Sequence, residues 1–339
     1  MHIKSQFFGE NQYSFVLGSS KTVNSTNQQN RWIPTKIWSA FVFCSRFSND
    51  RCSCFLVAPY QHEQKTLLTM ICNQQRIILL RNQMDRLQRW YSIIYERSNP
   101  PIQLVSEWHT FPFKSIGFTD HNQIYIFTDR EFLIYSIDLS SRLHSCILLN
   151  DQNYHAYCHN IDLGYGGTVY GNRIYHIYRT LDQHWILSVL EFPTTTHLID
   201  HDLTLILPSL TRIVNLSINA RLISFLVLIN EYKYAVLFCT HDTSLKIHLK
   251  KLIHLSYEQN PRSICSIYCP SMNKDIYFIN DPSAKIIHLL TADKYLQSYT
   301  LMAHALYYIE QNDELLFVAN DGIYSIAINE HQEFFSKFQ

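Results

Sequence analysis

The chain has 339 residues, with 28 Lys or Arg against 28 Asp or Glu, so its formal net charge is zero. Only 17% of its residues are charged, and it holds 22 Tyr, 20 Phe and 5 Trp, which excludes a disordered chain because disorder requires high charge and few aromatics. Zero net charge argues against a nucleic-acid binder, since such proteins present a basic face to phosphate groups.

Hydropathy and cysteine usage predict a soluble, cytoplasmic protein that does not enter a membrane. The first twenty residues contain no apolar core of a secretory leader. The longest apolar stretch, Leu222 to Ile229, is far shorter than the ~20 residues that cross a bilayer. The nine cysteines are an odd number at irregular spacings, which favours reduced thiols over a disulfide framework.

Short strand-like segments begin near the amino terminus. Residues 37–44 and 52–57 are rich in apolar and aromatic residues, and residues 12–17 are expected to pair with the last repeat unit. Residues 76–97 contain five arginines together with Trp90 and Tyr91, which raises two alternatives. They could form a basic and aromatic strip for RNA or acidic lipid, or solvated turns around two buried strands, and we favour the second.

One pattern recurs along the rest of the chain. An Asn precedes a short β-branched and aromatic run, and the intervals between successive instances are 49, 50, 47, 54 and 39 residues. In the best-defined unit, segments 113–118, 132–138 and 143–149 flank this run and are also strand-like, so each unit contains about four strands. The recurring residues are Asn73, Asn122, Asn172, Asn219, Asn273 and Asn312.

Four short strands per ~50 residues, repeated six or seven times, are typical of a β-propeller. Packing four-stranded blades radially covers both faces of each blade, which explains why Leu222 to Ile229 is apolar on both sides. We predict one all-β domain, a β-propeller of antiparallel blades, with seven blades favoured and six as the alternative. The expected units are residues 12–65, 66–108, 109–153, 154–203, 204–255, 256–302 and 303–339.

The run from Asn122 through Ile124 and Tyr125 to Asp129 resembles the NHL and YVTN-type propeller repeats, and Asn273 to Asp281 is a second match. The chain has eight glycines, whereas NHL repeats are usually richer in glycine, and it lacks the regular Trp-Asp pairs of WD40 repeats. The resemblance implies a propeller whose commonest role is partner binding, and it transfers no site residues.

Candidate chemistry is weak throughout the sequence. Gly164, Gly166, Gly167 and Gly171 suggest a phosphate loop, but a strand-like run follows them where such a loop needs a helix, so we predict a turn pair. Cys265 and Cys269 would lie roughly 13 Å apart along one strand, too far to share a metal ion. His155, Cys158 and His159 form the densest cluster of possible metal ligands, but no second pair follows at a defined spacing. His197 and His201 could share a helical face, but the residues around them favour a strand.

Two functional hypotheses follow. The first is a non-catalytic scaffold, without cofactor or metal, that binds a protein partner through loops on one rim. The alternative is a metal-dependent, lactonase-like propeller hydrolase with its site at the central channel. The turns between second and third strands supply the expected contact residues, which are Arg130, Glu131, Arg179, Asp182, Glu231, Lys233 and Lys285.

Two structural roles are also predicted. The recurring Asn residues and the Asp residues that end the second strands, Asp129, Asp281 and Asp321, are expected to bond backbone amides and hold tight turns. Five apolar positions are expected to be buried equivalently in successive second strands, namely Ile124, Ile174, Ile223, Ile276 and Leu315.

Overall fold

The structure is a computed structural model. It describes residues 54–59, 67–72, 76–82, 90–96, 102–109, 114–128, 131–137, 139–148, 166–180, 182–241, 244–255, 260–269, 273–300, 303, 305–309, 314–318 and 322–327.

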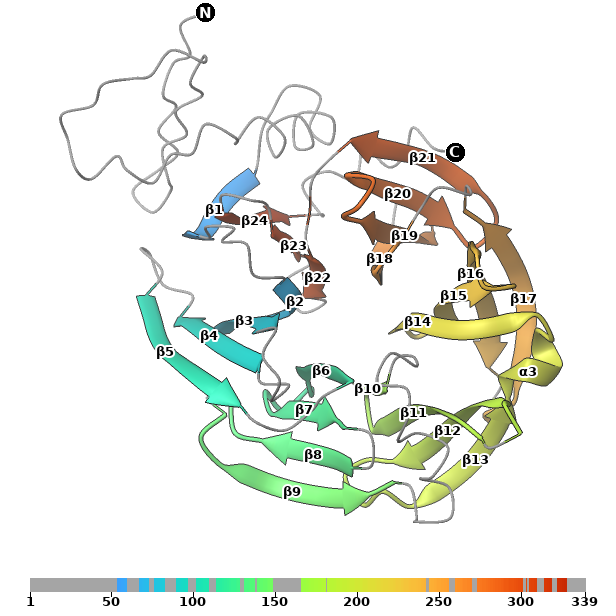
Figure 1. The fold of residues 1–339 in the computed structure, drawn as a ribbon, viewed down its shortest axis with the longest axis horizontal. Coiled ribbons are helices and arrows are strands. Elements are labelled where there is room, and N and C mark those ends of the chain that lie inside the picture. Colours follow the sequence, from blue (N-terminus) through green and yellow to red (C-terminus); the bar gives the residue numbers. More distant parts are fainter. Residues whose placement is uncertain are drawn as a thin grey trace, which may run out of the picture.

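These residues form six antiparallel sheets of four strands, arranged as a ring (Figure 1). In the first five sheets the strands are ordered as they follow one another in the chain, so each sheet is a meander. Sheet I contains β2 (Leu67–Cys72), β3 (Arg76–Asn82), β4 (Trp90–Glu96) and β5 (Ile102–His109); sheet II contains β6 (Ser115–Phe118), β7 (Ile124–Phe127), β8 (Glu131–Tyr135) and β9 (Arg142–Ile147); sheet III contains β10 (Gly167–Tyr170), β11 (Arg173–Arg179), β12 (Trp185–Glu191) and β13 (His197–Asp202). Sheet IV contains β14 (Leu210–Ile218), β15 (Ile223–Ile229), β16 (Lys233–His241) and β17 (Ile247–His254); sheet V contains β18 (Ser263–Cys269), β19 (Lys274–Asp281), β20 (Ile286–Thr291) and β21 (Tyr295–Thr300); sheet VI contains β22 (Ala305–Ile309), β23 (Glu314–Val318), β24 (Gly322–Ala327) and β1 (Cys54–Pro59).

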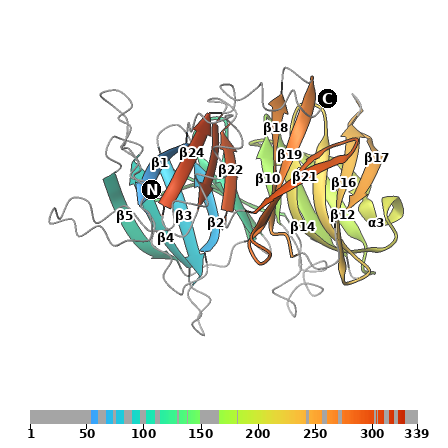
Figure 2. The ribbon, with the colours of Figure 1, turned by 90° about the horizontal axis from the view of Figure 1, so that it is seen from above.

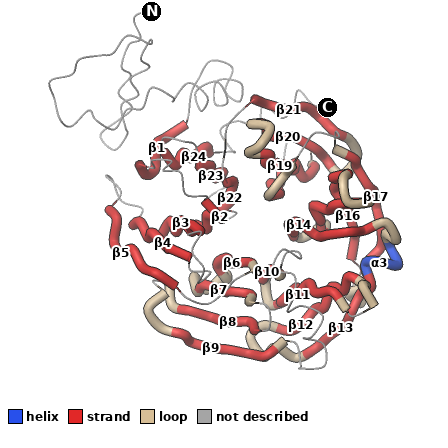
Figure 3. The backbone as a smooth tube through the Cα atoms, in the orientation of Figure 1, coloured by secondary structure: helices blue, strands red, loops and turns tan. Residues whose placement is uncertain are grey.

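The predicted all-β propeller of four-stranded blades is therefore confirmed, and strands dominate the part of the chain that is described (Figure 3). The innermost strands contact one another in the cyclic order β2, β6, β10, β14, β18, β22 and back to β2. The count of seven blades and the NHL or YVTN subtype are not confirmed, because the described residues form six sheets.

Closure of the ring involves a different segment from the one expected. The strand β1 pairs with β24, with Cys54 opposite Ile326 and Pro59 opposite Gly322, and so becomes the outermost strand of sheet VI. The sequence pattern had instead predicted that residues 52–57 belong to a separate first blade. The expected closing segment, residues 12–17, lies outside the described residues, as do residues 37–44.

Each recurring Asn precedes the second strand of a sheet. The runs after Asn73, Asn122, Asn172, Asn219, Asn273 and Asn312 are β3, β7, β11, β15, β19 and β23. All five predicted core positions are buried, with at most 1% of the residue surface exposed at Ile124, Ile174, Ile223, Ile276 and Leu315. Residues 76–97 contain two strands, β3 and β4, and Trp90 begins the second of them.

Side chains fill the spaces between sheets, and this explains the strand that is apolar on both faces. On β15, Ile223 and Phe225 pack in a cluster with Tyr175 and other residues of sheet III. Leu226, on the opposite face of β15, packs in a cluster with Tyr277 of sheet V. Successive residues of a strand point to opposite faces, so both faces of β15 are covered by neighbouring sheets.

The same clusters correct the predicted equivalence of Ile276. Tyr277 and Ile279 face sheet IV, so Ile276 points away from sheet IV, toward the other face of sheet V. In sheet II the corresponding tyrosine faces the other way around the ring. Tyr125 packs in a cluster with Ile174 of sheet III, the following sheet, whereas Tyr277 of sheet V faces sheet IV, the preceding one. The two runs that look alike in sequence therefore differ by one residue in register, since Ile276 follows Asn273 by three positions and Ile124 follows Asn122 by two.

The ring has two faces, defined by its connections. The chain reverses direction at each strand, so after four strands it is back at the face of the ring where the sheet began. The links between sheets therefore lie on that face, together with the turns between second and third strands. We call this side the connection face. The turns between first and second and between third and fourth strands lie on the opposite face. Figure 2, turned by 90° from Figure 1, shows the strands running between the two faces.

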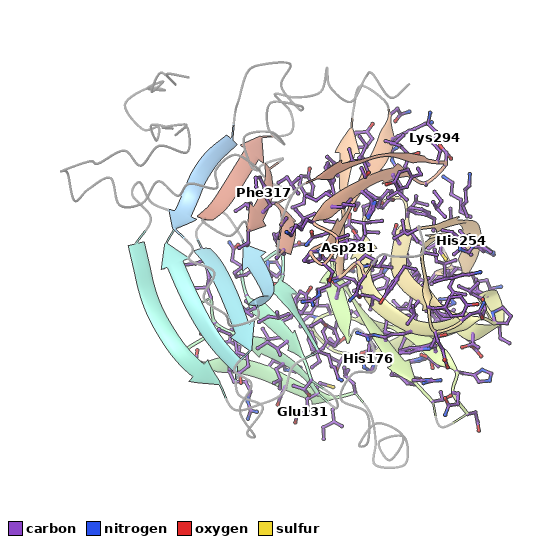
Figure 4. All side chains as sticks on the ribbon, turned by 45° about the horizontal axis from the view of Figure 1, so that its top comes forward. Glu131, His176, His254, Asp281, Lys294 and Phe317 are labelled. Atoms are coloured by element: carbon purple, nitrogen blue, oxygen red, sulfur yellow. The ribbon has the colours of Figure 1, made fainter. Side chains whose placement is uncertain are left out.

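The seam between sheets II and III contains a buried histidine. His176 on β11 is 4% exposed, and its ring stacks on Phe127 of sheet II at 6.0 Å and on Tyr178 at 5.3 Å between ring centroids. Figure 4 shows His176 on the ribbon of its sheet. Burial lowers the pKa of His176 to about 4, against a smaller opposing effect of the Asp200 charge.

This burial predicts acid sensitivity of folding. An unfolded His176, with its usual pKa of 6.5, binds more protons than the folded one between pH 6.5 and about 4, so stability falls as pH falls through this window and levels off below it. The loss reaches at most about 3 kcal/mol, because one pKa unit corresponds to about 1.4 kcal/mol. Urea unfolding of wild type and His176→Phe between pH 7.5 and 4.5 measures it, and the variant should show a shallower loss.

The exposed His254 provides the control for this measurement. His254→Gln should keep the wild-type pH dependence, because this side chain is exposed at the end of β17. Buried His288, whose pKa is also lowered by burial, should contribute the slope that remains in the His176→Phe variant. Equal slopes in wild type and His176→Phe would contradict the assignment of the acid sensitivity to His176.

Candidate functional site

The predicted contact residues that the structure describes lie at turns of the connection face, in four different sheets. Glu131 begins β8, Arg179 ends β11, and Asp182 lies in the turn that follows β11. Glu231 lies in the turn before β16, which begins at Lys233. Lys285 is exposed in the turn before β20, and Arg130 lies outside the described residues.

A short helix, α3 (Leu203–Ile206), links sheets III and IV on this face. The side chain of Asp202 caps it, with Oδ1 accepting hydrogen bonds from the backbone N–H groups of Thr204 and Leu205 at 2.9 and 3.4 Å. The other oxygen, Oδ2, is 2.5 Å from Nδ1 of His184 in the neighbouring turn. Burial works against the ionised form of Asp202, but the hydrogen bonds from His184 and the two amides hold its pKa below the usual value.

Further hydrogen bonds tie α3 to the turns on both sides. The backbone N–H of Trp185 donates to Oγ1 of Thr204 at 2.7 Å, and the indole N–H of Trp185 donates to the carbonyl of Thr211 at 3.1 Å. The backbone N–H of Glu231 donates to Oγ1 of Thr211 at 3.1 Å. Three segments, residues 182–185, 202–211 and 230–232, are therefore joined into one surface although they are far apart in the chain.

The turns on either side of α3 are tight. Gln183 has φ 71°, Asn230 has φ 48° and Glu231 has φ 67°. These left-handed conformations are uncommon for residues other than glycine and hold the adjacent side chains in defined directions. The side chain of Arg179 is held by contacts instead. Its Nε donates to the carbonyl of Gln183 at 3.4 Å, and its guanidinium lies 5.7 Å from the ring centre of Trp185.

This arrangement exposes two large apolar side chains among charged ones. Leu205 on α3 is 75% exposed, and Tyr232 in the turn before β16 is 60% exposed. The side chain of Lys233 lies 5.5 Å from the ring centre of Tyr232. We call this set the α3 surface and define it as Arg179, Asp182, His184, Leu205, Glu231, Tyr232 and Lys233.

The structure thus brings four predicted residues together, Arg179, Asp182, Glu231 and Lys233, and leaves two apart. Glu131 belongs to sheet II and Lys285 to sheet V, one sheet away on either side. Three members of the α3 surface, His184, Leu205 and Tyr232, were not predicted from the sequence. Asp202, with Thr204 two positions later and apolar residues after it, is a weak sequence signal for a capped turn. The helix could not be predicted from the sequence, because its four residues are too few to show helical periodicity.

The predicted structural role of Asp281 is confirmed. This buried carboxylate accepts hydrogen bonds from the backbone N–H of Ala284 at 2.9 Å and from that of Asn260 at 2.6 Å, so it holds both the turn after β19 and the link between sheets IV and V (Figure 4). Asn219 acts likewise, accepting at 2.9 Å from the backbone N–H groups of Arg221 and Leu222. Asp129 and Asp321 lie outside the described residues.

The glycine cluster is not a phosphate loop in shape. Strand β11 follows it, and Gly171 lies in the turn between β10 and β11 with φ 58°, as expected for a turn. Gly167, however, begins the innermost strand β10 and packs against the ring of Phe127 in sheet II. Its role is close packing between sheets, which corrects the prediction of a turn pair at that position. Gly164 lies outside the described residues.

Among the described residues, no group of three or more His, Cys, Asp or Glu side chains could hold a metal ion. His197 and His201 lie on the strand β13, and Cys265 lies on the strand β18, as predicted. Cysteines 146, 239 and 265 are unpaired. The cluster of His155, Cys158 and His159 lies outside the described residues.

The part of the chain that is described contains no helix long and apolar enough to cross a membrane.

No family model matches the sequence, and no curated protein matches it. Three solved structures that resemble it are each 10% identical to it in sequence. The WD40 repeats of RRP9 give a TM-score of 0.48 and cover 79% of this chain and 96% of that chain. A catalytically inactive virginiamycin B lyase from Staphylococcus aureus with quinupristin gives 0.44, covering 80% and 99%. Hsv2 of Kluyvelomyces marxianus gives 0.39, covering 76% and 70%.

Proposed function

We propose that this chain is a non-catalytic β-propeller scaffold, one domain over its length, that binds a protein partner in the cytoplasm through the α3 surface. The observation that carries the proposal is the joining of three turns by hydrogen bonds around α3, which holds Leu205 and Tyr232 exposed. Large apolar anchors within a polar and charged rim are the usual composition of a protein interface.

Rigidity supports this proposal. A binding surface that is ordered before it meets its partner loses less conformational entropy on association. The α3 surface is held by the Asp202 cap, by the bonds of Trp185 to Thr204 and Thr211, and by the bond of Glu231 to Thr211. Its described charges are of both signs, so it favours recognition by complementarity over attraction of polyanions.

The test replaces the two anchors. In Leu205→Ser with Tyr232→Ser, affinity for a partner identified with the wild-type protein should fall at least tenfold, because truncation of interface anchors commonly costs more than about 1 kcal/mol each. The partner is identified by cross-linking and mass spectrometry, and affinity is measured with the purified pair. Melting temperature should change little, since both side chains are mainly exposed.

The matched control is Leu143→Ser with Ile147→Ser on β9. These side chains are 53% and 70% exposed, and they lie on the outermost strand of sheet II. The control should keep wild-type affinity. Loss of binding in the control, with full affinity in the anchor variant, would place the interface on the outer strands and contradict this proposal.

A further inference from the structure

A concentration of positive charge lies at the seam between sheets IV and V, on the face opposite the α3 surface. It contains five cations and two carboxylates, a local charge of +3 in a chain whose formal net charge is zero. We call it the basic seam. Its residues are Arg221, Lys250, Lys251, Lys274, Lys294, Asp275 and Asp293.

Two carboxylates, those of Asp293 and Asp275, lie among these cations. The Nζ atom of Lys274 lies 3.1 Å from Oδ2 of Asp293, and Nζ of Lys251 donates to the carbonyl of Asp293. The hydrogen bond from Lys274 holds the pKa of Asp293 below its usual value, with smaller effects from the charges of Lys274, Lys250 and Lys251. Lys294 follows Asp293 in the chain and is exposed at the periphery of the ring (Figure 4).

Asp275 is counted in this local charge, but it is 8% exposed, so it lies below the surface that a ligand would meet. Burial raises its pKa, against opposing effects of the Arg221 charge, a hydrogen bond from Asn219 and the Lys250 charge. Lys250 therefore lies near both carboxylates, which makes the seam one electrostatic unit and not two separate ion pairs.

Arg221 is held in position by sheet V. Its Nη1 donates to the carbonyl of Asn273 and its Nη2 donates to Oδ1 of the same residue, both at 3.1 Å. Its guanidinium lies 4.4 Å from the ring centre of Tyr268, whose hydroxyl also donates to Oδ1 of Asn273 at 3.0 Å. A guanidinium has five N–H donors, so three remain available after the two bonds to Asn273. Such a fixed guanidinium suits a carboxylate, which can accept two of its N–H groups.

We propose that the basic seam binds an acidic, Asp- and Glu-rich segment of a protein partner, independently of the α3 surface. The position of Tyr268 argues for a protein segment over the other polyanions. Single-stranded nucleic acid is bound through aromatic faces on which bases stack, and Arg221 covers a face of Tyr268. A membrane site would require several apolar side chains that insert beside the cations. The hydroxyls of Tyr268 and Tyr295 are instead bonded to Asn273 and His288, and Leu249, an exposed aliphatic side chain next to Lys250, offers little area for insertion.

The probe is a fluorescein-labelled peptide of ten glutamates, and its binding to the full-length protein is measured by fluorescence anisotropy. We expect saturable binding that weakens several-fold when salt is raised from about 50 to about 300 mM, because salt screens exposed charges.

The triple variant with Arg221→Gln, Lys250→Gln and Lys294→Gln should bind the peptide at least about tenfold more weakly than wild type, since charge complementarity is lost. Lys250 and Lys294 are exposed, so Lys250→Gln with Lys294→Gln provides a second variant that leaves the bonds of Arg221 intact.

The control removes charge from the other face. Lys233→Gln with Lys285→Gln should bind the peptide within about twofold of wild type, since these residues lie at turns of the connection face, the face opposite the seam. Equal weakening in this control and in Lys250→Gln with Lys294→Gln would show attraction without a site and overturn the proposal. Tighter binding of phosphatidylserine vesicles or of a uridine decamer than of the peptide would also overturn it.

Discussion

Replacing Ile223 with aspartate is expected to unfold the protein. Ile223 is 1% exposed and packs between sheets III and IV in one cluster with Tyr175, Phe225 and Leu237. An aspartate there would place a charge in an apolar layer that offers it no partner, and the cost should exceed about 4 kcal/mol, a large part of the stability of most domains. Circular dichroism and size-exclusion chromatography should show loss of the folded protein, or the protein should be insoluble.

Two controls separate charge from size and from position. Ile223→Val removes one methyl group and should cost about 1 kcal/mol. Leu198→Asp introduces the same charge on the outermost strand of sheet III, where the side chain is 43% exposed, and should remain folded. A folded Ile223→Asp protein with an unchanged melting temperature would show that this position does not lie between two sheets.

Replacing Gly167 with alanine should destabilise the ring by about 3 kcal/mol or more, because backbone strain and steric overlap add at one position. Gly167 has φ 151°, a conformation that L-residues rarely adopt, and a Cβ atom there would lie 2.4 Å from the backbone carbonyl of Tyr175 and 2.9 Å from the ring of Phe127. The carbonyl of Gly167 also accepts a hydrogen bond from Oγ of Ser115 at 2.7 Å, which ties β10 to sheet II. The strand therefore cannot shift without losing that bond.

The matched change is Gly171→Asn in the turn of the same hairpin. Gly171 has φ 58°, a Cβ atom added there would have no neighbour within 4 Å, and asparagine tolerates this conformation. Urea unfolding should show a small effect for Gly171→Asn and a large one for Gly167→Ala. Similar effects at the two positions would mean that conformational preference alone, and not packing between sheets II and III, requires glycine at 167.

The candidate site was only partly predictable. Charged residues in the turns between second and third strands could be assigned to one face, because the meander places those turns together. Leu205 and Tyr232 were missed, because exposure of an apolar side chain depends on what the rest of the fold leaves uncovered. The link of His184 to Asp202 joins residues that face each other only after β12 and β13 have paired.

The strand content, the repeat of about fifty residues and the burial of the second strands could be predicted from the amino-acid sequence alone. These follow from short runs of β-branched and aromatic residues and from turn-forming Asn and Asp, which act over a few neighbouring positions. Three features became apparent only in the folded chain: β1 completes sheet VI, Ile276 faces away from sheet IV, and three segments meet around α3. Those features arise from pairing between distant segments, and a one-residue change of register, which leaves the local pattern almost unaltered, moves every side chain of a strand to the other face.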